Sequence, residues 1–445
     1  MSAPAGRGGA EPSEDAPPAS TWRRTPAGPV ALVVGVLLLA TGLVLGRPDA
    51  ALLGLPLLVC AAGGRPSSPA APARLTVRAL PPGSRPGAAG DGSVPFELLP
   101  PAPPDAELVV LRVSLAGGAP RHLVVLPGRP LRGRVVPAHS GPLRVIAASA
   151  WPVAPDGAAV AEPVGPAVLD RVVAATPTPL RVLPLPARPR GSAGGHDGVR
   201  PGTGGAFRDI GPFAPGDRLR AIDWKVTARR ARFDGDLHAR RTTATADATV
   251  VIAVDSRDDV SASIRTWARG APDDDGPSSL DLARRAASSL AAATVRAGDR
   301  VGLVDLGAEG RDVPAGAGGR HLQRVLTAVA GTGPRGVHRP AARLAPVPPD
   351  ALVYLVSTFL DDLPADAARE WLARGHPVVA VDVLPAPAVD DATDELRLAH
   401  RVVAIERADR LAELRSAGAG TVRWEPDPAA QLLALSRRPV RGRRP

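Results

Sequence analysis

The chain has 445 residues, enough for about three domains of ordinary size, and its 47 glycines and 52 prolines predict long irregular stretches. The single cysteine, Cys60, excludes a disulfide framework and a cysteine-built zinc or iron–sulfur site. The net charge of +10 would suit nucleic acid, but the arginines are scattered among acidic residues without aromatic interleaving, so we expect no nucleic-acid partner.

Residues 1–28 lack hydrophobic periodicity, and we expect them to be disordered. Residues 29–64 follow with two uncharged apolar runs, which Arg47, Pro48 and Asp49 separate. About 20 helical residues span a hydrocarbon core, so the pattern predicts a two-helix transmembrane hairpin in the lipid bilayer. A cleaved signal peptide and a buried soluble hairpin are the alternatives. The second run, interrupted by Pro56, is the shorter one.

Arginines flank the hairpin at its entry and its exit, and only one lies in the turn. The positive-inside rule then places both ends of the hairpin in the cytoplasm. We therefore expect a multi-pass protein of the cell membrane whose large C-terminal region is cytoplasmic.

Residues 75–187 show short apolar runs broken by proline and glycine, as in a β-sandwich-like module. Two isolated histidines, His122 and His139, are interpreted there as surface or strand residues. Residues 188–204, rich in glycine, arginine and proline, are predicted to form a linker.

Residues 205–246 contain the most informative run of the chain. The Pro215–Asp217 turn is predicted to set Asp217 at a helix start. Arg220 and Asp223 have the i,i+3 spacing of a helical ion pair, and Trp224 is expected to fill an interior. A purely structural cluster and a surface for a partner both remain open at this point.

This run resembles the signature of the bacterial family called domain of unknown function 58. The matching positions are Phe213, Gly216, Asp217, Arg220, Ile222, Asp223, Trp224, Ala228 and Arg229. The family usually has tyrosine at Phe213, serine at Thr227 and acidic residues around Arg240 and Arg241. The resemblance implies a membrane hairpin, a β-rich insert, the signature and a von Willebrand factor A-like domain, in that order. It also implies cooperation with a MoxR-type AAA+ ATPase.

Residues 247–436 alternate apolar strands with helices, which predicts an α/β fold with a doubly wound parallel sheet covered on both faces. The predicted strands are 249–255, 300–306, 352–357, 377–383 and 401–405. The predicted helices are 278–297, 320–330, 365–374 and 409–417. Residues 437–445 form a basic tail.

The von Willebrand A-like resemblance implies a divalent-metal site at the carboxyl ends of the strands, reading Asp-x-Ser-x-Ser after the first strand. Here Asp255 is followed by Arg257, whose charge repels a cation, and Thr358 stands where the distal aspartate is expected. Degenerate candidates remain, and they are Asp255, Asp259, Ser261, Ser263 and Asp361. We expect no metal and no cofactor.

The sequence shows no spaced Ser/His/Asp set, no phosphate-binding loop and no histidine cluster. We therefore interpret the chain as a membrane-anchored, non-enzymatic interaction protein that works in assembly or chaperoning. A metal-dependent adhesion-type ligand-binding protein and, behind it, an enzyme are the alternatives.

Overall fold

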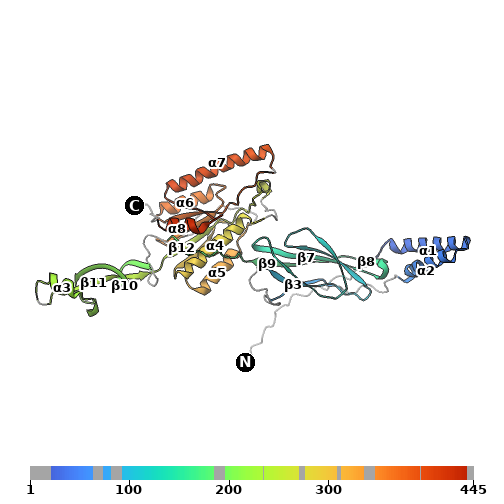
Figure 1. The fold of residues 1–445 in the computed structure, drawn as a ribbon, viewed down its shortest axis with the longest axis horizontal. Helices are drawn as coiled ribbons and strands as arrows, with labels where there is room; N and C mark the ends of the chain where they lie inside the picture. The colour runs from blue at the N-terminus through green and yellow to red at the C-terminus, as the bar shows by residue number, and fades with distance from the viewer. Residues whose placement is uncertain are drawn as a thin grey trace, which may run out of the picture. The chain divides into compact units, whose positions relative to one another are not determined.

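The structure of the chain is a computed structural model (Figure 1). It describes residues 22–63, 74–81, 93–184, 196–233, 235–269, 276–307, 312–334, 346–390 and 392–437. The chain divides into two compact units. The β-rich unit comprises residues up to 137 and 144–171, and the α/β unit comprises residues 138–143 and those from 172 onward. The predicted mixed α/β organisation is confirmed.

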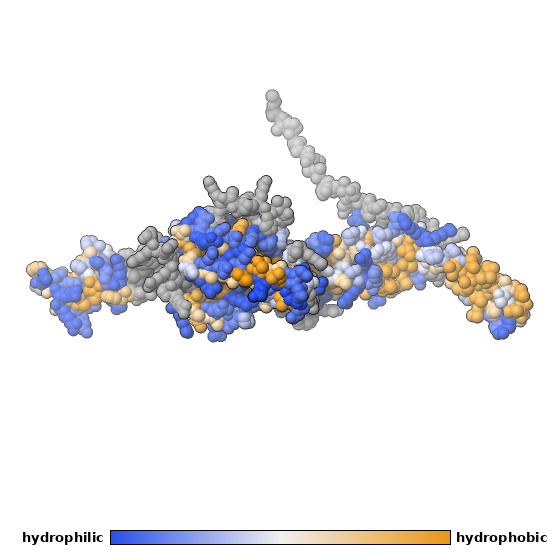
Figure 2. Space-filling view, turned by 90° about the horizontal axis from the view of Figure 1, so that it is seen from above, coloured by the Kyte–Doolittle hydropathy of each residue, from blue (hydrophilic) through white to orange (hydrophobic). Residues whose placement is uncertain are grey.

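Two apolar helices open the β-rich unit, α1 (Ala27–Val44) and α2 (Pro48–Gly63). Their surface is mostly hydrophobic, as seen at the right of Figure 2. Among the residues that the structure describes, α1 is the one helix with the length and composition to cross a membrane. The apolar part of α2 is shorter. Helix length therefore supports one candidate span and does not support the predicted multi-pass arrangement.

Small residues lie where these two helices meet. A Cβ atom on Gly42 would lie 2.4 Å from the backbone nitrogen of Ala51, and one on Gly54 would lie 2.6 Å from the carbonyl oxygen of Gly35. Backbones approach so closely only where no side chain intervenes. Such packing through small residues is typical of helices in lipid, where no hydrophobic effect drives helix association.

A short strand precedes the hairpin. β1 (Trp22–Arg24) pairs antiparallel with β8 (Ala159–Ala161), and the Thr25 hydroxyl donates to the carbonyl oxygen of Gly157. The structure thus orders residues 22–28, for which we predicted disorder, whereas residues 1–21 lie outside the described residues. The partner strand lies far along the chain, so local composition gave no sign of this pairing.

Two antiparallel sheets form the rest of the β-rich unit. One has the order β2-β3-β6 and the other β1-β8-β7-β4-β5, with β9 beside β7. The remaining strands are β2 (Thr76–Ala79), β3 (Val94–Leu99), β4 (Leu108–Leu115), β5 (Arg121–Val125), β6 (Leu131–Val135), β7 (Gly141–Val153) and β9 (Val164–Val173). One apolar cluster takes side chains from both sheets, among them Leu98 of β3 and Leu111 of β4. The two sheets therefore share a core.

A six-stranded sheet is the frame of the α/β unit. Its order is β14-β13-β12-β15-β16-β17, and all neighbours are parallel except the edge strand β14. The strands are β12 (Thr249–Val254), β13 (Arg300–Asp305), β14 (Val313–Gly316), β15 (Leu352–Ser357), β16 (Val378–Asp382) and β17 (Gly420–Arg423). The helices around them are α4 (Ser279–Arg296), α5 (Gly319–Ala330), α6 (Leu363–Ala373), α7 (Asp394–Ser416) and α8 (Pro428–Ser436).

Helices cover both faces of this sheet (Figure 1). Val250 and Ile252 of β12 belong to an apolar cluster with α4, α5 and α8, while Val251 and Ala253 belong to a second cluster with α6 and α7. Burial of both faces explains why β12 is a continuous apolar run. The carboxyl ends of the parallel strands meet at one edge of the sheet, which we call the carboxyl edge.

The segment Arg401–Ile405, predicted to be a strand, is part of helix α7. Its consecutive apolar residues are ambiguous between strand and helix. In the helix, Leu398, Val402 and Ile405 are spaced to share one face, and all three are exposed. The last strand of the sheet is instead β17, whose four residues are too few to show a pattern.

Two long strands, β10 (His196–Pro212) and β11 (His238–Ala246), form an antiparallel pair that we call the signature ribbon. The structure places residues 196–204 in β10, where we predicted a linker; residues 188–195 lie outside the described residues. Glycine and proline hide the strand pattern, and the register shifts at several irregularities. Most of the family signature lies between the two strands, at the tip of the ribbon.

Candidate functional site: the signature ribbon and the carboxyl edge of the sheet

A tight turn opens the tip of the signature ribbon. The backbone nitrogen of Asp217 donates to the carbonyl oxygen of Ala214, and the Asp217 carboxylate accepts from the nitrogen of Ala214 at 3.0 Å. Gly216 has a φ of +100°, which favours glycine. The carboxylate also lies 3.7 Å from Arg241. Asp217 therefore closes the turn, and the short 3₁₀ helix that follows (Leu219–Ala221) begins after Arg218 rather than at Asp217.

Asp223 caps the short helix α3 (Trp224–Arg230). Its Oδ1 accepts from the backbone nitrogen of Val226 at 3.0 Å, a typical N-cap bond. The predicted Arg220–Asp223 ion pair does not form, because the carboxylate faces the start of α3 and the two residues do not share a helix. Arg220 is exposed.

Trp224 is 68% exposed, so the prediction that it fills an interior is wrong. α3 has only seven residues and none is buried. Leu219 and Phe233 nearby in the sequence are also exposed. The tip therefore presents large apolar side chains to solvent, which is typical of an interaction surface when such side chains gather together.

At the tip, the acidic side chains bond the backbone and the basic side chains face solvent. Asp217, Asp223 and Asp236 all accept bonds from backbone nitrogens. The basic residues Arg220, Lys225, Arg229 and Arg230 are exposed. The tip therefore exposes both large apolar side chains and basic residues.

The other signature residues connect the tip to the ribbon. The backbone nitrogen of Phe213 donates to Leu237, Ile222 forms an isolated bridge with Ala239, and Ala228 is exposed. Arg240, at a position where the family has acids, lies 5.4 Å from the ring centre of Phe207. A cation–π contact thus stands on β10 and β11 just below the tip.

At the carboxyl edge of the sheet, one arginine bridges two carboxylates. Arg257 donates to Asp255 from Nε at 2.8 Å and from Nη2 at 3.0 Å, and to Asp361 from Nη1 at 2.6 Å and from Nη2 at 2.7 Å. The side chains of Arg257 and Asp255 are 9% and 6% exposed. Burial alone would lower the pKa of Arg257, but the bonds to Asp361 and Asp255 raise it above its ordinary value. The guanidinium is thus permanently charged.

The literal Asp-x-Ser-x-Ser string lies apart from this bridge. Asp259 accepts from the backbone nitrogen of Leu280 at 3.1 Å, and burial raises the pKa of its carboxyl. Ser261 is buried and bonds the Thr266 hydroxyl at 2.8 Å, while Ser263 bridges to Ala388. These contacts are structural, and Asp259 is half-buried. Over the described ranges, no group of three or more His, Cys, Asp or Glu is placed to hold a metal ion.

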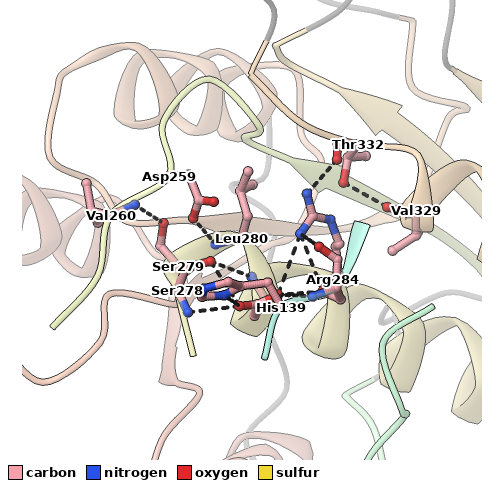
Figure 3. A network of polar contacts seen from close by, with 11 residues as sticks. His139, Asp259, Val260, Ser278, Ser279, Leu280, Arg284, Val329 and Thr332 are labelled. Atoms are coloured by element: carbon pink, nitrogen blue, oxygen red, sulfur yellow. Dashed lines mark hydrogen bonds and ion pairs between the residues drawn. The ribbon is translucent and has the colours of Figure 1, made fainter. Parts of the chain in front are cut away.

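A polar network that the sequence did not suggest lies at the start of α4 (Figure 3). Asp281 accepts from His139 Nδ1 at 2.6 Å, from the nitrogen and hydroxyl of Ser140 at 2.6 and 2.7 Å, and from the nitrogen of Ser278 at 3.0 Å. Ser278 and Asp281 form a capping box. Burial would raise the pKa of Asp281, but these bonds hold it well below its usual range.

Arg284 completes this network from the next turn of α4. It donates to the carbonyl oxygens of Ser140 at 2.8 Å and Thr332 at 2.7 Å. His139, interpreted above as an isolated histidine, is therefore tied to α4 through Asp281. The Ser-x-x-Asp spacing could have revealed the capping box, but nothing local in the sequence links it to residues 139–140. These bonds hold the loop at residues 139–140 against α4, and a structural role explains the whole network.

No curated protein and no solved structure matches this chain. Residues 209–412 match the model of the family described as "Protein of unknown function DUF58". The matched range runs from β10 through the tip of the ribbon and the central strands into α7, and it contains every signature residue named above. Over these residues the chain is similar to the DUF58 family.

Proposed function

We propose that the chain is a membrane-anchored, non-enzymatic interaction protein whose signature ribbon docks onto a protein partner. The family resemblance implies a MoxR-type AAA+ ATPase as the partner and assembly or chaperoning as the process. Within this proposal, the α/β unit is a von Willebrand A-like domain, in keeping with its strand order and with helices on both faces.

The exposure of Trp224 carries the docking proposal. Trp224 is 68% exposed on a short capped helix, so its side chain contributes little to the packing of the core. Tryptophan and arginine are enriched among the residues that dominate binding energy at protein interfaces. Trp224, Leu219 and the neighbouring arginines therefore offer a ready contact surface.

The anchor is the α1–α2 hairpin. α1 supplies the candidate span, and the glycine contacts between α1 and α2 are suited to lipid. We propose that both helices enter the membrane together, with the C-terminal region in the cytoplasm on the side of the flanking arginines. The bridge between Arg257, Asp255 and Asp361 disfavours the metal-dependent adhesion alternative, because a guanidinium already binds both carboxylates.

Capture of a purified MoxR-type AAA+ ATPase of the same organism by the full, detergent-solubilised chain tests this proposal. Trp224→Ala should weaken capture about 30-fold, as removal of an interface hot spot costs about 2 kcal/mol. Leu398→Ala is the matched control, because Leu398 is 65% exposed on α7.

The two variants separate the possible surfaces. Unchanged capture by Leu398→Ala with weakened capture by Trp224→Ala would support docking through the ribbon. The reverse result would place the interface on the exposed face of α7. No capture by the unaltered chain would refute this partner.

A further inference from the structure

The carboxyl edge of the sheet contains a carboxylate pair from two different strand ends. Asp255 directly follows β12, and Asp361 lies in the loop after β15. The Ser357 hydroxyl donates to Asp255 Oδ2 at 2.8 Å and accepts from the nitrogen of Phe359 at 3.0 Å. The pair and its hydroxyl are the oxygen groups that hard divalent cations prefer.

Arg257 occupies the space between these carboxylates. Its three nitrogens make four bonds, two to each carboxylate, so the fork of the guanidinium is shared by both. A guanidinium cannot be deprotonated in a protein, and it presents donors in a fixed plane. A second cation at the same oxygens would meet a fixed positive charge within bonding distance.

Two further arginines extend this arrangement from α7. Arg407 forms an ion pair with Asp382 and donates to the carbonyl oxygen of Thr358 at 2.7 Å. Arg410 forms an ion pair with Asp362 and donates to the carbonyl oxygen of Leu360 at 3.2 Å. Carboxylates and carbonyls at or just beyond the carboxyl ends of β12, β15 and β16 are thus bound by arginine side chains.

We propose that Arg257 is a built-in cation of the carboxyl edge. It keeps divalent ions out of the native chain, and the Asp255–Asp361 pair becomes a divalent-cation site only when the guanidinium is removed. The edge is then a closed, metal-independent part of the fold. This inference does not depend on the signature ribbon or on its partner.

The test is Mn²⁺ binding to the full chain in detergent. Titration calorimetry measures the binding directly, and a shift of the melting temperature measures it independently. The native chain should show no binding. Arg257→Ser should bind Mn²⁺ with a dissociation constant on the order of 0.1–1 mM, as weak oxygen-ligand sites do. The double variant Arg257→Ser/Asp361→Asn should lose that binding.

A second readout needs no metal. Asp361→Asn should lower the melting temperature of the native chain, because it removes a partner of Arg257. In the Arg257→Ser background the same change should raise the melting temperature, because it relieves repulsion between two carboxylates. If Arg257→Ser alone does not fold, the double variant should recover folding.

Four results would overturn the proposal. The first is Mn²⁺ binding by the native chain that disappears in Asp255→Asn. The second is folded Arg257→Ser that binds no Mn²⁺ at millimolar concentrations. The third is an Asp361→Asn effect on the melting temperature that has the same sign in both backgrounds. The fourth is that neither Arg257→Ser nor the double variant folds.

Discussion

Replacing Asp281 by asparagine should destabilise the α/β unit by about 2–4 kcal/mol near neutral pH. An amide keeps one acceptor oxygen and places an NH₂ group where the other oxygen was, so at least one of the donors from His139, Ser140 and Ser278 loses its acceptor. A buried donor left without a partner costs about 1–3 kcal/mol. The bonds that remain lose the contribution of the negative charge, about 1 kcal/mol more.

The size of this effect should depend on pH. The folded pKa of Asp281 lies below the value of about 3.9 expected in an unfolded chain. A carboxyl of this kind stabilises the fold above its unfolded pKa, and the stabilisation is lost as the pH falls through the folded pKa. The difference between the native chain and Asp281→Asn should therefore be full at neutral pH and shrink below about pH 4.

Urea titrations followed by tryptophan fluorescence measure the effect, because Trp371 and Trp424 are buried in the α/β unit. Asp366→Asn is the matched control. Asp366 also lies in the first turn of a helix, but it is exposed and pairs with Arg369 on the surface, where an ion pair is worth about 0–1 kcal/mol. Equal midpoints for the two variants, or a gap that widens in acid, would refute the reasoning.

Two further predictions follow from burial and from charge. Trp371→Ala should lower the free energy of unfolding by about 3–5 kcal/mol, because Trp371 is fully buried. Trp224→Ala should change it by no more than about 0.5 kcal/mol, because Trp224 is exposed. Equal losses in urea titrations of the two variants would contradict this difference in burial. Protease added to intact spheroplasts should leave the α/β unit uncut if it is cytoplasmic, and digestion there would reverse the proposed topology.

The central strands of the α/β unit could be predicted from the sequence. β15 (Leu352–Ser357) has the predicted bounds, and β12 ends one residue before its predicted end at Asp255. Both strands are buried on two faces, so both require apolar residues at consecutive positions, and this run is visible in the sequence. The predicted helix 409–417 covers the end of α7, but the earlier part of α7 was missed because its apolar residues at 402 and 405 face solvent, which removes the usual link between hydrophobicity and burial.

The candidate sites were harder to predict for a related reason. Asp255 and Arg257 are neighbours in sequence, so their repulsion of a cation could be inferred, but the contact with Asp361 depends on the pairing of β12 with β15. The sequence predicts an interior position for Trp224, one of six tryptophans in an aromatic-poor chain, and only the short helix α3 shows that no interior exists there. The bond from His139 to Asp281 joins residues 142 positions apart.

The connection between β11 and β12 is short and buried, so it would transmit a force on the ribbon to the sheet. Residues 247 and 248 alone separate the two strands, Ala246 and Ala248 are buried, and the nitrogen of Ala248 donates to Asp299 at 2.8 Å. A link this short, with its backbone bonded, cannot act as a swivel. Tension on the ribbon would pass directly into β12, which has a parallel neighbour on each side. Pulling β12 along its axis would load the hydrogen bonds to both neighbouring strands in shear at once.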